Sequence, residues 1–221
     1  MERRRALERE HKELYAQVFQ GPTPEFPEED AAEAAVAAAV AGHTTAEQAR
    51  ATAQRAVEQL THAQQHMQRA LSEVQSALTA SMYDIAGTGN NFYADMQEHS
   101  ALGRAEAEAQ RMYGYVMAAV AICPDLSAFH MPPVHVQQGD ILGDVMFDNV
   151  YTDMHYHQQH QRSQAQLQAA AAVLAQMHAH AVGAQATAAA ASESTRAAVQ
   201  HSRSTLTAIR DRIFASVTAA A

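Results

Sequence analysis

The chain has 221 residues, a formal net charge of -9 and a single cysteine, and 50 of its residues are alanine. One cysteine excludes an internal disulfide bond, and an acidic chain without a basic, aromatic-rich patch is poorly suited to bind nucleic acid. The longest apolar runs, such as "YVMAAVAIC", are too short to cross a membrane. Alanine is the best helix former, while glycine and proline, the worst, number only nine and six. The composition therefore predicts an all-α fold.

The first part of the chain predicts a helix, a linker and a second helix. Residues 1–20 form a short charged helix without the apolar stretch of a signal peptide, so we expect a cytoplasmic protein. Residues 21–30, "GPTPEFPEED", hold three prolines and a glycine, which is typical of a linker. Residues 31–43 predict a short alanine-rich helix that ends near Gly42.

A long helix is predicted over residues 45–86. Thr44 or Thr45 can cap its N-terminus, with Glu47 or Gln48 placed to complete a capping box. Large apolar residues then recur in steps of three and four, which is the pattern of a coiled-coil seam. The seam consists of Val57, Leu60, Gln64, Met67, Leu71, Val74, Leu78 and Ser81. His62 and His66 lie off this seam, so we expect them on a solvated face.

Two further helices follow with the same spacing. The helix over residues 92–122 ends before Pro124, and its seam consists of Leu102, Ala105, Ala109, Met112, Val116, Ala119 and Cys123. The last helix covers residues 166–218 and continues back to about residue 140, with one possible bend near Gly183. Its seam holds Leu167, Ala170, Leu174, Met177, Ala181, Ala184, Ala188, Ala191 and Thr195. A stutter after Ala191 leads to Val199.

The helix lengths predict how the long helices pair. Residues 45–86 and 176–217 are equally long, each spanning roughly 63 Å at 1.5 Å per residue. Antiparallel pairing makes an elongated coiled-coil stalk and leaves residues 87–165 as a small helical head. It also places Leu60 and Leu71 beside residues 190–210. The far side of such a stalk exposes an apolar stripe unless another copy covers it, so we expect a homodimer.

The predicted head is acidic. Residues 84–160 contain ten acidic and two basic residues together with six histidines. We therefore expect a basic protein partner at the head. The negative surroundings should also raise the pKa of these histidines above its ordinary value of ~6.5. The head would then be more stable at about pH 6 than at about pH 8.

One stretch of the head, "FDNVYTDMHYHQQH" (residues 147–160), has the residue types of a metal site. On a helix, Asp153, His157 and His160 share one face, and Asp148 and His155 share another. Aspartate and histidine are ligands that zinc and other divalent metals accept. The stretch lacks the His-Glu-x-x-His motif, and a polar helix surface biased towards Gln and His has the same composition. The sequence is therefore consistent with a metal site and also with an ordinary polar helix surface.

Two segments resemble a known group of proteins. "SMYDIAGTGNNFYADMQEHSAL" (residues 81–102) and "GDILGDVMFDNVYTDMHYH" (residues 139–157) are similar to segments of uncharacterised fungal proteins rich in Ala/Gln coiled coil. The resemblance covers roughly residues 45–217. It implies a eukaryotic intracellular origin, and it implies no activity, cofactor or site.

Catalytic motifs are missing from the sequence. "GTGNNF" lacks the third glycine of a dinucleotide-binding loop, and the chain contains neither a P-loop nor a G-x-S-x-G motif. We therefore expect a structural or protein–protein interaction protein, a scaffold or adaptor, without enzymatic activity or cofactor. The alternative is a helical metal-binding protein that uses the Asp/His cluster at residues 148–160.

Overall fold

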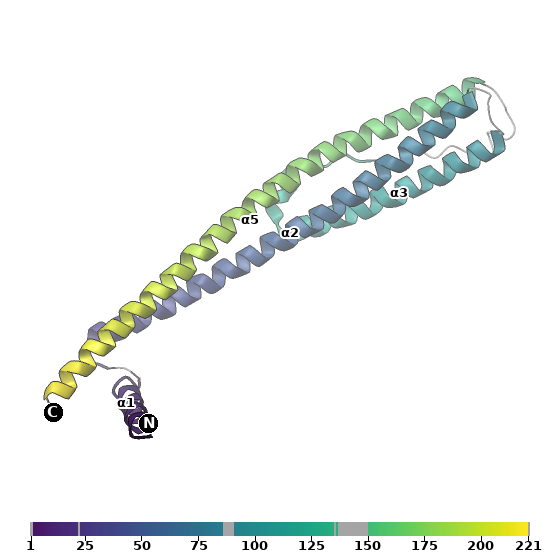
Figure 1. Ribbon diagram of the computed structural model, residues 1–221. Coiled ribbons are helices and arrows are strands. Elements are labelled where there is room, and N and C mark those ends of the chain that lie inside the picture. Colours follow the sequence, from purple (N-terminus) through teal and green to yellow (C-terminus); the bar gives the residue numbers. More distant parts are fainter. Residues whose placement is uncertain (1, 22, 86–90, 135, 137–149, 221) are drawn as a thin grey trace. The chain divides into compact units, whose positions relative to one another are not determined.

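The computed structural model describes residues 2–21, 23–85, 91–134, 136 and 150–220. Most of these residues are helical and none lies in a strand, which confirms the all-α prediction (Figure 1). The elements are α1 (Glu2–Val18), α2 (Pro27–Ile85), α3 (Asn91–Ile122), the 3-10 helix η1 (Pro124–Ala128) and α5 (Val150–Ala220). The chain divides into two compact units, of which unit 1 comprises residues 1–50 and 187–221 and unit 2 comprises residues 51–186.

Helix α2 is one continuous helix where the sequence predicted two. It begins at Pro27 with three acidic residues in its first turn, which suits the positive end of the helix dipole. It then passes through Gly42. A glycine destabilises a helix by about 1 kcal/mol relative to alanine, and the many alanines around Gly42 favour the helix enough to keep it continuous. The predicted capping role of Thr44 and Thr45 is wrong, because their hydroxyls donate back to the carbonyls of Val40 and Ala41 within the helix.

Helix α3 and the described part of α5 agree with the predicted helices. Helix α3 covers Asn91–Ile122, against a prediction of 92–122. Helix α5 continues without interruption through Gly183 to Ala220. Its predicted beginning at about residue 140 lies outside the described residues.

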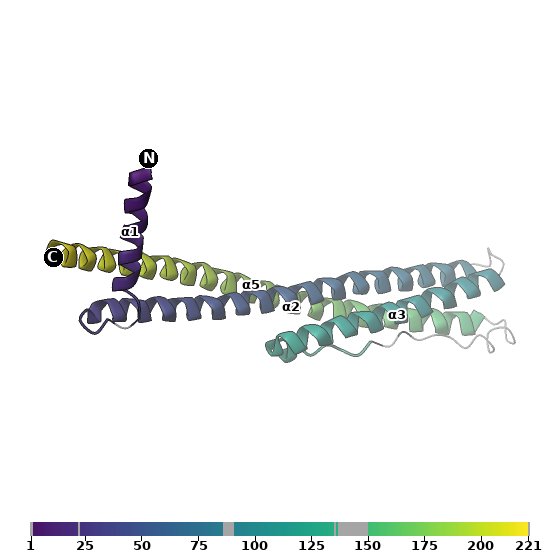
Figure 2. The same ribbon diagram turned by 90° about the horizontal axis from the view of Figure 1, so that it is seen from below.

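In unit 2, α2, α3 and α5 lie side by side, as two perpendicular views show (Figures 1 and 2). The predicted seam of α3 is confirmed, because its residues from Leu102 to Ala119 are buried. On α2 the buried stripe is wider than predicted because this helix packs against two others. Ala56, Ala63, Ala70 and Ala77 are buried together with Leu60, Met67, Val74 and Leu78. Val57 and Leu71 are only half-buried.

Helices α2 and α5 of unit 2 run in opposite directions. Thr61 Oγ1 lies 3.2 Å from His178 Nε2, and Gln164 donates a 2.8 Å hydrogen bond to Gln75. Moving along α2 from Thr61 to Gln75 therefore corresponds to moving in the opposite chain direction along α5, from His178 to Gln164. The predicted position of Leu60 and Leu71 beside residues 190–210 is wrong. Because α2 begins at Pro27, its extra N-terminal residues take the place beside the end of α5 that residues 45–86 were expected to fill.

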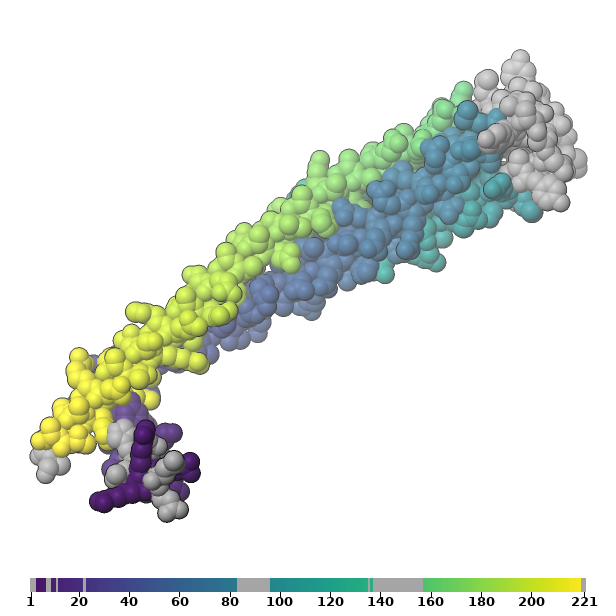
Figure 3. Space-filling model, in the orientation of Figure 1, coloured from purple at the N-terminus to yellow at the C-terminus, as the bar shows by residue number. Residues whose placement is uncertain are grey.

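The segment that follows α3 belongs to unit 2 and packs against its three long helices. Leu126 of η1 and Val136 are buried in the same core as the three helices. The Tyr113 hydroxyl donates to the Pro132 carbonyl oxygen, and the rings of Phe129 and His180 are 5.5 Å apart. Figure 3 shows the close packing of α2 against α5 within this unit.

Unit 1 is formed by α1, the beginning of α2 and the end of α5. The guanidinium of Arg210 lies 5.1 Å from the centre of the Phe19 ring, and the Tyr15 ring lies 5.5 Å from that of Phe214. The Tyr15 hydroxyl also donates a 3.2 Å hydrogen bond to Asp211. Aromatic and cationic contacts therefore attach the end of α1 to α5.

The pairing of α2 with α5 in unit 1 shifts one position of the predicted seam. Ser192 is buried where Ala191 was expected, and its hydroxyl donates to Glu47. His43 Nδ1 lies 3.2 Å from Thr195 Oγ1. Polar side chains thus occupy the interface of this alanine-rich pair. No helix in the described part of the chain is long and apolar enough to cross a membrane.

Candidate functional site

The structure locates only part of the predicted metal cluster. Asp148 lies outside the described residues, and Asp153 and His155 lie in the first turns of α5 with side chains that are not described. His157 and His160 are described, one helical turn further along α5 in unit 2. Whether Asp148, Asp153 and His155 bind a metal stays a prediction.

His160 is a core residue. Among the described side chains of α5 it is the first buried one, and the buried stripe continues in steps of three and four through Ser163, Leu167 and Ala170. The residue is 0% exposed, and neither ring nitrogen has a hydrogen-bond partner among the described residues. Burying an imidazole without a hydrogen-bond partner lowers the stability of the folded state by roughly 1–3 kcal/mol. Sequence spacing could have identified this burial, because His160 is in register with the Leu167 seam.

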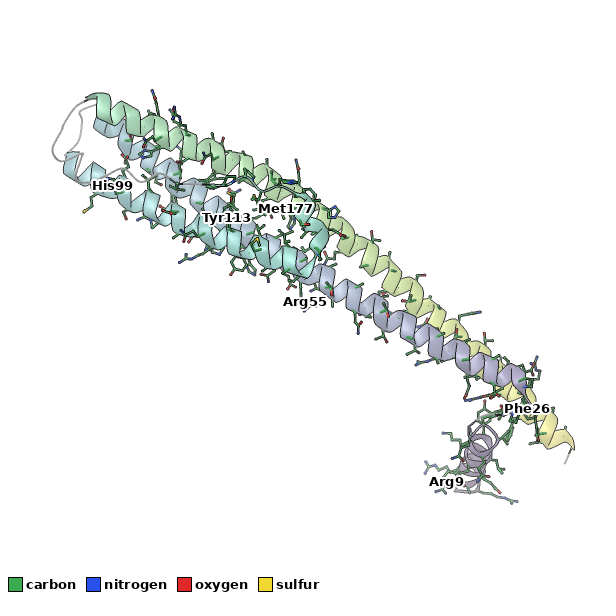
Figure 4. The ribbon with its side chains drawn as sticks, turned by 180° about the vertical axis from the view of Figure 1, so that it is seen from behind. Arg9, Phe26, Arg55, His99, Tyr113 and Met177 are labelled. Carbon is green, nitrogen blue, oxygen red and sulfur yellow. The ribbon has the colours of Figure 1, made fainter. Side chains whose placement is uncertain are left out.

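A second helix supplies the neighbours of His160. Glu98 of α3 brings its Oε1 atom to 3.3 Å from Nδ1 of His160, without the geometry of a hydrogen bond. His99, the next residue of α3, and His157 of α5 are close enough to act electrostatically on the His160 ring. Figure 4 shows His99 near the beginning of α3. The site therefore joins α3 and α5, and the α3 residues were not among the predicted ones.

Burial determines the charge of His160. Loss of solvent, together with the nearby His157 and His99, lowers the pKa of His160 from 6.5 to about 4. The ring is therefore neutral at pH 7, and its approach to Glu98 is not an ion pair. The sequence predicted a raised pKa for the head histidines, and for His160 that prediction is wrong because the side chain lies in the core rather than on the acidic surface.

Among the described residues, no three His, Cys, Asp or Glu side chains converge closely enough to hold a metal ion as they stand. His157 nevertheless resembles His160 in one respect, because its Nδ1 atom is buried and has no partner among the described residues. Its Nε2 atom lies 3.0 Å from the side-chain nitrogen of Gln161. The two histidines of α5 thus hold three buried ring nitrogens without a hydrogen-bond partner among the described residues.

A second polar cluster, which the sequence did not predict, lies between α2 and α3 of unit 2. His66 Nδ1 is 2.6 Å from Glu108 Oε2, and Arg111 donates to the other Glu108 oxygen at 2.5 Å. The Tyr115 ring lies 5.2 Å from the ring of His66 and 5.2 Å from that of His62. The hydrogen bond from His66 is the main cause of a lowered pKa at Glu108.

The prediction that His66 is solvated is therefore wrong. Only 14% of its side chain is exposed, because α3 packs beside α2 at this position. His62 is exposed, as predicted. An i, i+4 histidine pair beside a seam cannot reveal from sequence alone that a third helix will cover one of its members.

Among the described residues, a groove lies between α2 and α5 in each unit. The unit 2 groove has a volume of about 380 Å³ and is lined mainly by glutamine and small or apolar side chains. The unit 1 groove, about 370 Å³, is lined by His43, Glu47, Arg50, Ser192 and their neighbours. In the second groove the Ser192 hydroxyl donates to a carboxylate rather than to an imidazole. This pairing does not activate a serine nucleophile in the way that a histidine base does.

Comparisons with protein-family models, with curated proteins and with solved structures find no match to this chain.

Proposed function

We propose that the chain is a structural or protein–protein interaction protein, a scaffold or adaptor, without catalytic activity. In this proposal α2 and α5 form an antiparallel coiled-coil stalk, and residues 87–165 form a small acidic helical head. A homodimeric state and a cytoplasmic location are part of the same proposal. The observation that supports it best is that α2 and α5 keep the same antiparallel register between two contacts of unit 2, Thr61 with His178 and Gln75 with Gln164.

Heptad packing is a further support. Buried residues in α2, α3 and α5 recur in steps of three and four, and alanines alternate with larger side chains. This is the pattern by which long helices pack closely along their length. In such an arrangement the buried residues serve to hold the helices in register. The grooves between the helices are open, so they are suited to contacts with other proteins rather than to enclosing a substrate.

The charge of unit 2 supports a basic partner. Residues 51–186 contain twelve acidic and five basic residues. Part of this charge is already paired, as in the 2.9 Å contact between Arg104 and Glu73. Glu58 and Asp125 are exposed and stay available to a cationic surface.

The helix register is tested by disulfide trapping. Cys123→Ser removes the only native cysteine, and the pairs Thr61→Cys with His178→Cys and Gln75→Cys with Gln164→Cys are then oxidised separately. Both should cross-link within one chain. The exchanged pair, Thr61→Cys with Gln164→Cys, is the matched control and should not. Cross-linking of the exchanged pair alone would contradict the antiparallel stalk.

The partner is tested with a basic peptide as probe. An oligo-arginine peptide should bind the full chain, and binding should weaken as salt rises. Neutralising Glu58 and Asp125 to Gln and Asn should weaken binding several-fold, while Glu25→Gln in unit 1 should leave it unchanged. Equal binding by the native chain and both variants would refute a specific acidic surface on unit 2. Light scattering in solution then tests the dimer against the 23.9 kDa chain mass.

A further inference from the structure

We propose that Glu98 of α3, together with His157 and His160 of α5, forms a binding site for a divalent metal ion of the zinc class in unit 2. The proposal does not depend on the scaffold function. It differs from the cluster predicted from sequence because one ligand comes from a different helix. The metal ion would link α3 to α5.

The unpartnered nitrogens of the two histidines are the first observation. His160 is 0% exposed and has two ring nitrogens without a partner among the described residues, and His157 adds a buried Nδ1 in the same condition. Buried polar atoms in native proteins are nearly always paired, and each exception calls for a bound group or water. A metal ion satisfies imidazole nitrogens directly.

The distance between Glu98 and His160 is the second observation. Two ligand atoms at Zn–N and Zn–O bond lengths of about 2.0–2.2 Å, at a tetrahedral angle, are separated by roughly 3.3–3.5 Å. The separation between Glu98 Oε1 and His160 Nδ1 is 3.3 Å, and the two atoms do not form a hydrogen bond. The carboxylate and the imidazole are therefore spaced as two neighbouring ligands of one tetrahedral ion.

The chemical state of the ligands is the third observation. A histidine binds a metal ion through an unprotonated ring nitrogen, and both ring nitrogens of His160 are buried without a partner among the described residues. A carboxylate with two imidazoles is a donor set that zinc accepts. It would leave a fourth position to water or to another side chain.

His157 completes the protein ligands by a side-chain movement. It lies three residues before His160 and therefore projects from the same side of α5. In the described arrangement its ring does not yet converge with the other two ligands. A rotation of this one side chain towards His160 is the change that metal binding would require. The side-chain nitrogen of Gln161 lies 3.0 Å from Nε2, and for Nδ1 to bind the ion the Gln161 amide would have to turn so that its oxygen accepts from Nε2–H.

The test uses the full chain after removal of metals with a chelator. Zn²⁺ affinity is measured by competition with a chromophoric chelator, and Co²⁺ is added to follow the visible absorption that tetrahedral coordination produces. We expect one equivalent of either ion to bind and Zn²⁺ to raise the melting temperature. Glu98→Gln and His160→Gln should each lower the Zn²⁺ affinity at least about tenfold.

Two matched controls separate this site from others. His201→Gln changes an exposed histidine of α5 in unit 1, and His62→Gln removes one member of the i, i+4 histidine pair on α2. Both should bind Zn²⁺ as the native chain does. Should His160→Gln lose helicity by circular dichroism, Glu98→Gln decides alone, because its carboxylate is replaced by a group of equal size. Absent binding by the native chain, unchanged affinity in Glu98→Gln, or loss of binding in His62→Gln would overturn the proposal.

Discussion

The Nε atom of Arg210 donates a 2.6 Å hydrogen bond to Oε1 of Glu29, a carboxylate that is fully buried within unit 1. The other oxygen of Glu29 accepts a 2.7 Å hydrogen bond from the Thr23 hydroxyl. The Arg210 guanidinium also contacts Glu33 and covers the Phe19 ring. One arginine thus joins the beginning of α2, the end of α5 and the residue that follows α1.

The first prediction follows from this pair. Arg210→Met should leave Glu29 buried without its cationic partner and lower the free energy of unfolding by roughly 3 kcal/mol, since removal of one member of a buried pair is costly. Adding Glu29→Gln should restore part of that loss. The control is Arg203→Met at an exposed position of α5, which should change stability by less than about 0.5 kcal/mol. Urea unfolding measures all three, and equal losses from Arg210→Met and Arg203→Met would contradict the pairing.

A second prediction compares positions of the unit 2 core. Leu60 is 0% exposed, whereas Leu71 is only half-buried. Leu60→Ala should therefore cost about 2–5 kcal/mol and Leu71→Ala clearly less. His66→Ala should cost roughly 1–2 kcal/mol, because it removes the hydrogen bond to Glu108. A larger loss at Leu71 than at Leu60 would show that the buried side of α2 is misassigned.

Glycines allow a third prediction. A Cβ added at Gly42 or Gly114 would meet no atom within 4 Å, and both residues lie inside helices. Gly42→Ala and Gly114→Ala should each stabilise the chain by roughly 0.5–1 kcal/mol. Gly21 has a φ of +86°, so Gly21→Ala should destabilise unit 1 by about 1 kcal/mol. Thermal melting distinguishes the two directions, and a stabilising Gly21→Ala would contradict the assigned backbone.

Local patterns predicted the helices better than their partners. Heptad spacing in "LGRAEAEAQRMYGYVMAAV" was sufficient to place the buried side of α3, because periodicity reports directly which side of a helix meets its neighbours. The register of α2 against α5 depends on where α2 begins, and the sequence predicts a helix boundary near Gly42, whereas α2 begins at Pro27. One glycine in the middle of a helix destabilises it only slightly, so the alanine-rich segments on both sides of Gly42 keep α2 continuous.

The candidate site shows the same limit. The seam spacing of α5 includes His160, so its burial could have been derived from sequence. Glu98 could not have been, because α3 supplies it and no short motif links the two positions. The contact between His66 and Glu108 escaped prediction for the same reason. Contacts between residues far apart in sequence require the packing of three helices to be known.

The last prediction concerns pH and the buried ring of His160. Its folded-state pKa is about 4, below the ordinary value of 6.5 expected in the unfolded chain. Between these values the unfolded state binds more protons, so stability rises with pH across that window. The contribution is fully present above about pH 6.5 and is lost as pH falls towards 4, by an amount on the order of 3 kcal/mol.

Of the groups that face this ring, His157 and His99 act in the same direction as burial, and the Glu98 carboxylate acts against it. His157 and His99 oppose a positive charge on His160, and Glu98 lies beside its Nδ1 atom. A chelator is present throughout, because a bound metal would also be released by acid. Urea unfolding at pH 7 and pH 5 should show a large loss for the native chain and for His201→Gln, and a much smaller one for His160→Gln. Greater stability of the native chain at pH 5 would mean that these histidines gain their charge on folding, as the acidic composition alone had predicted.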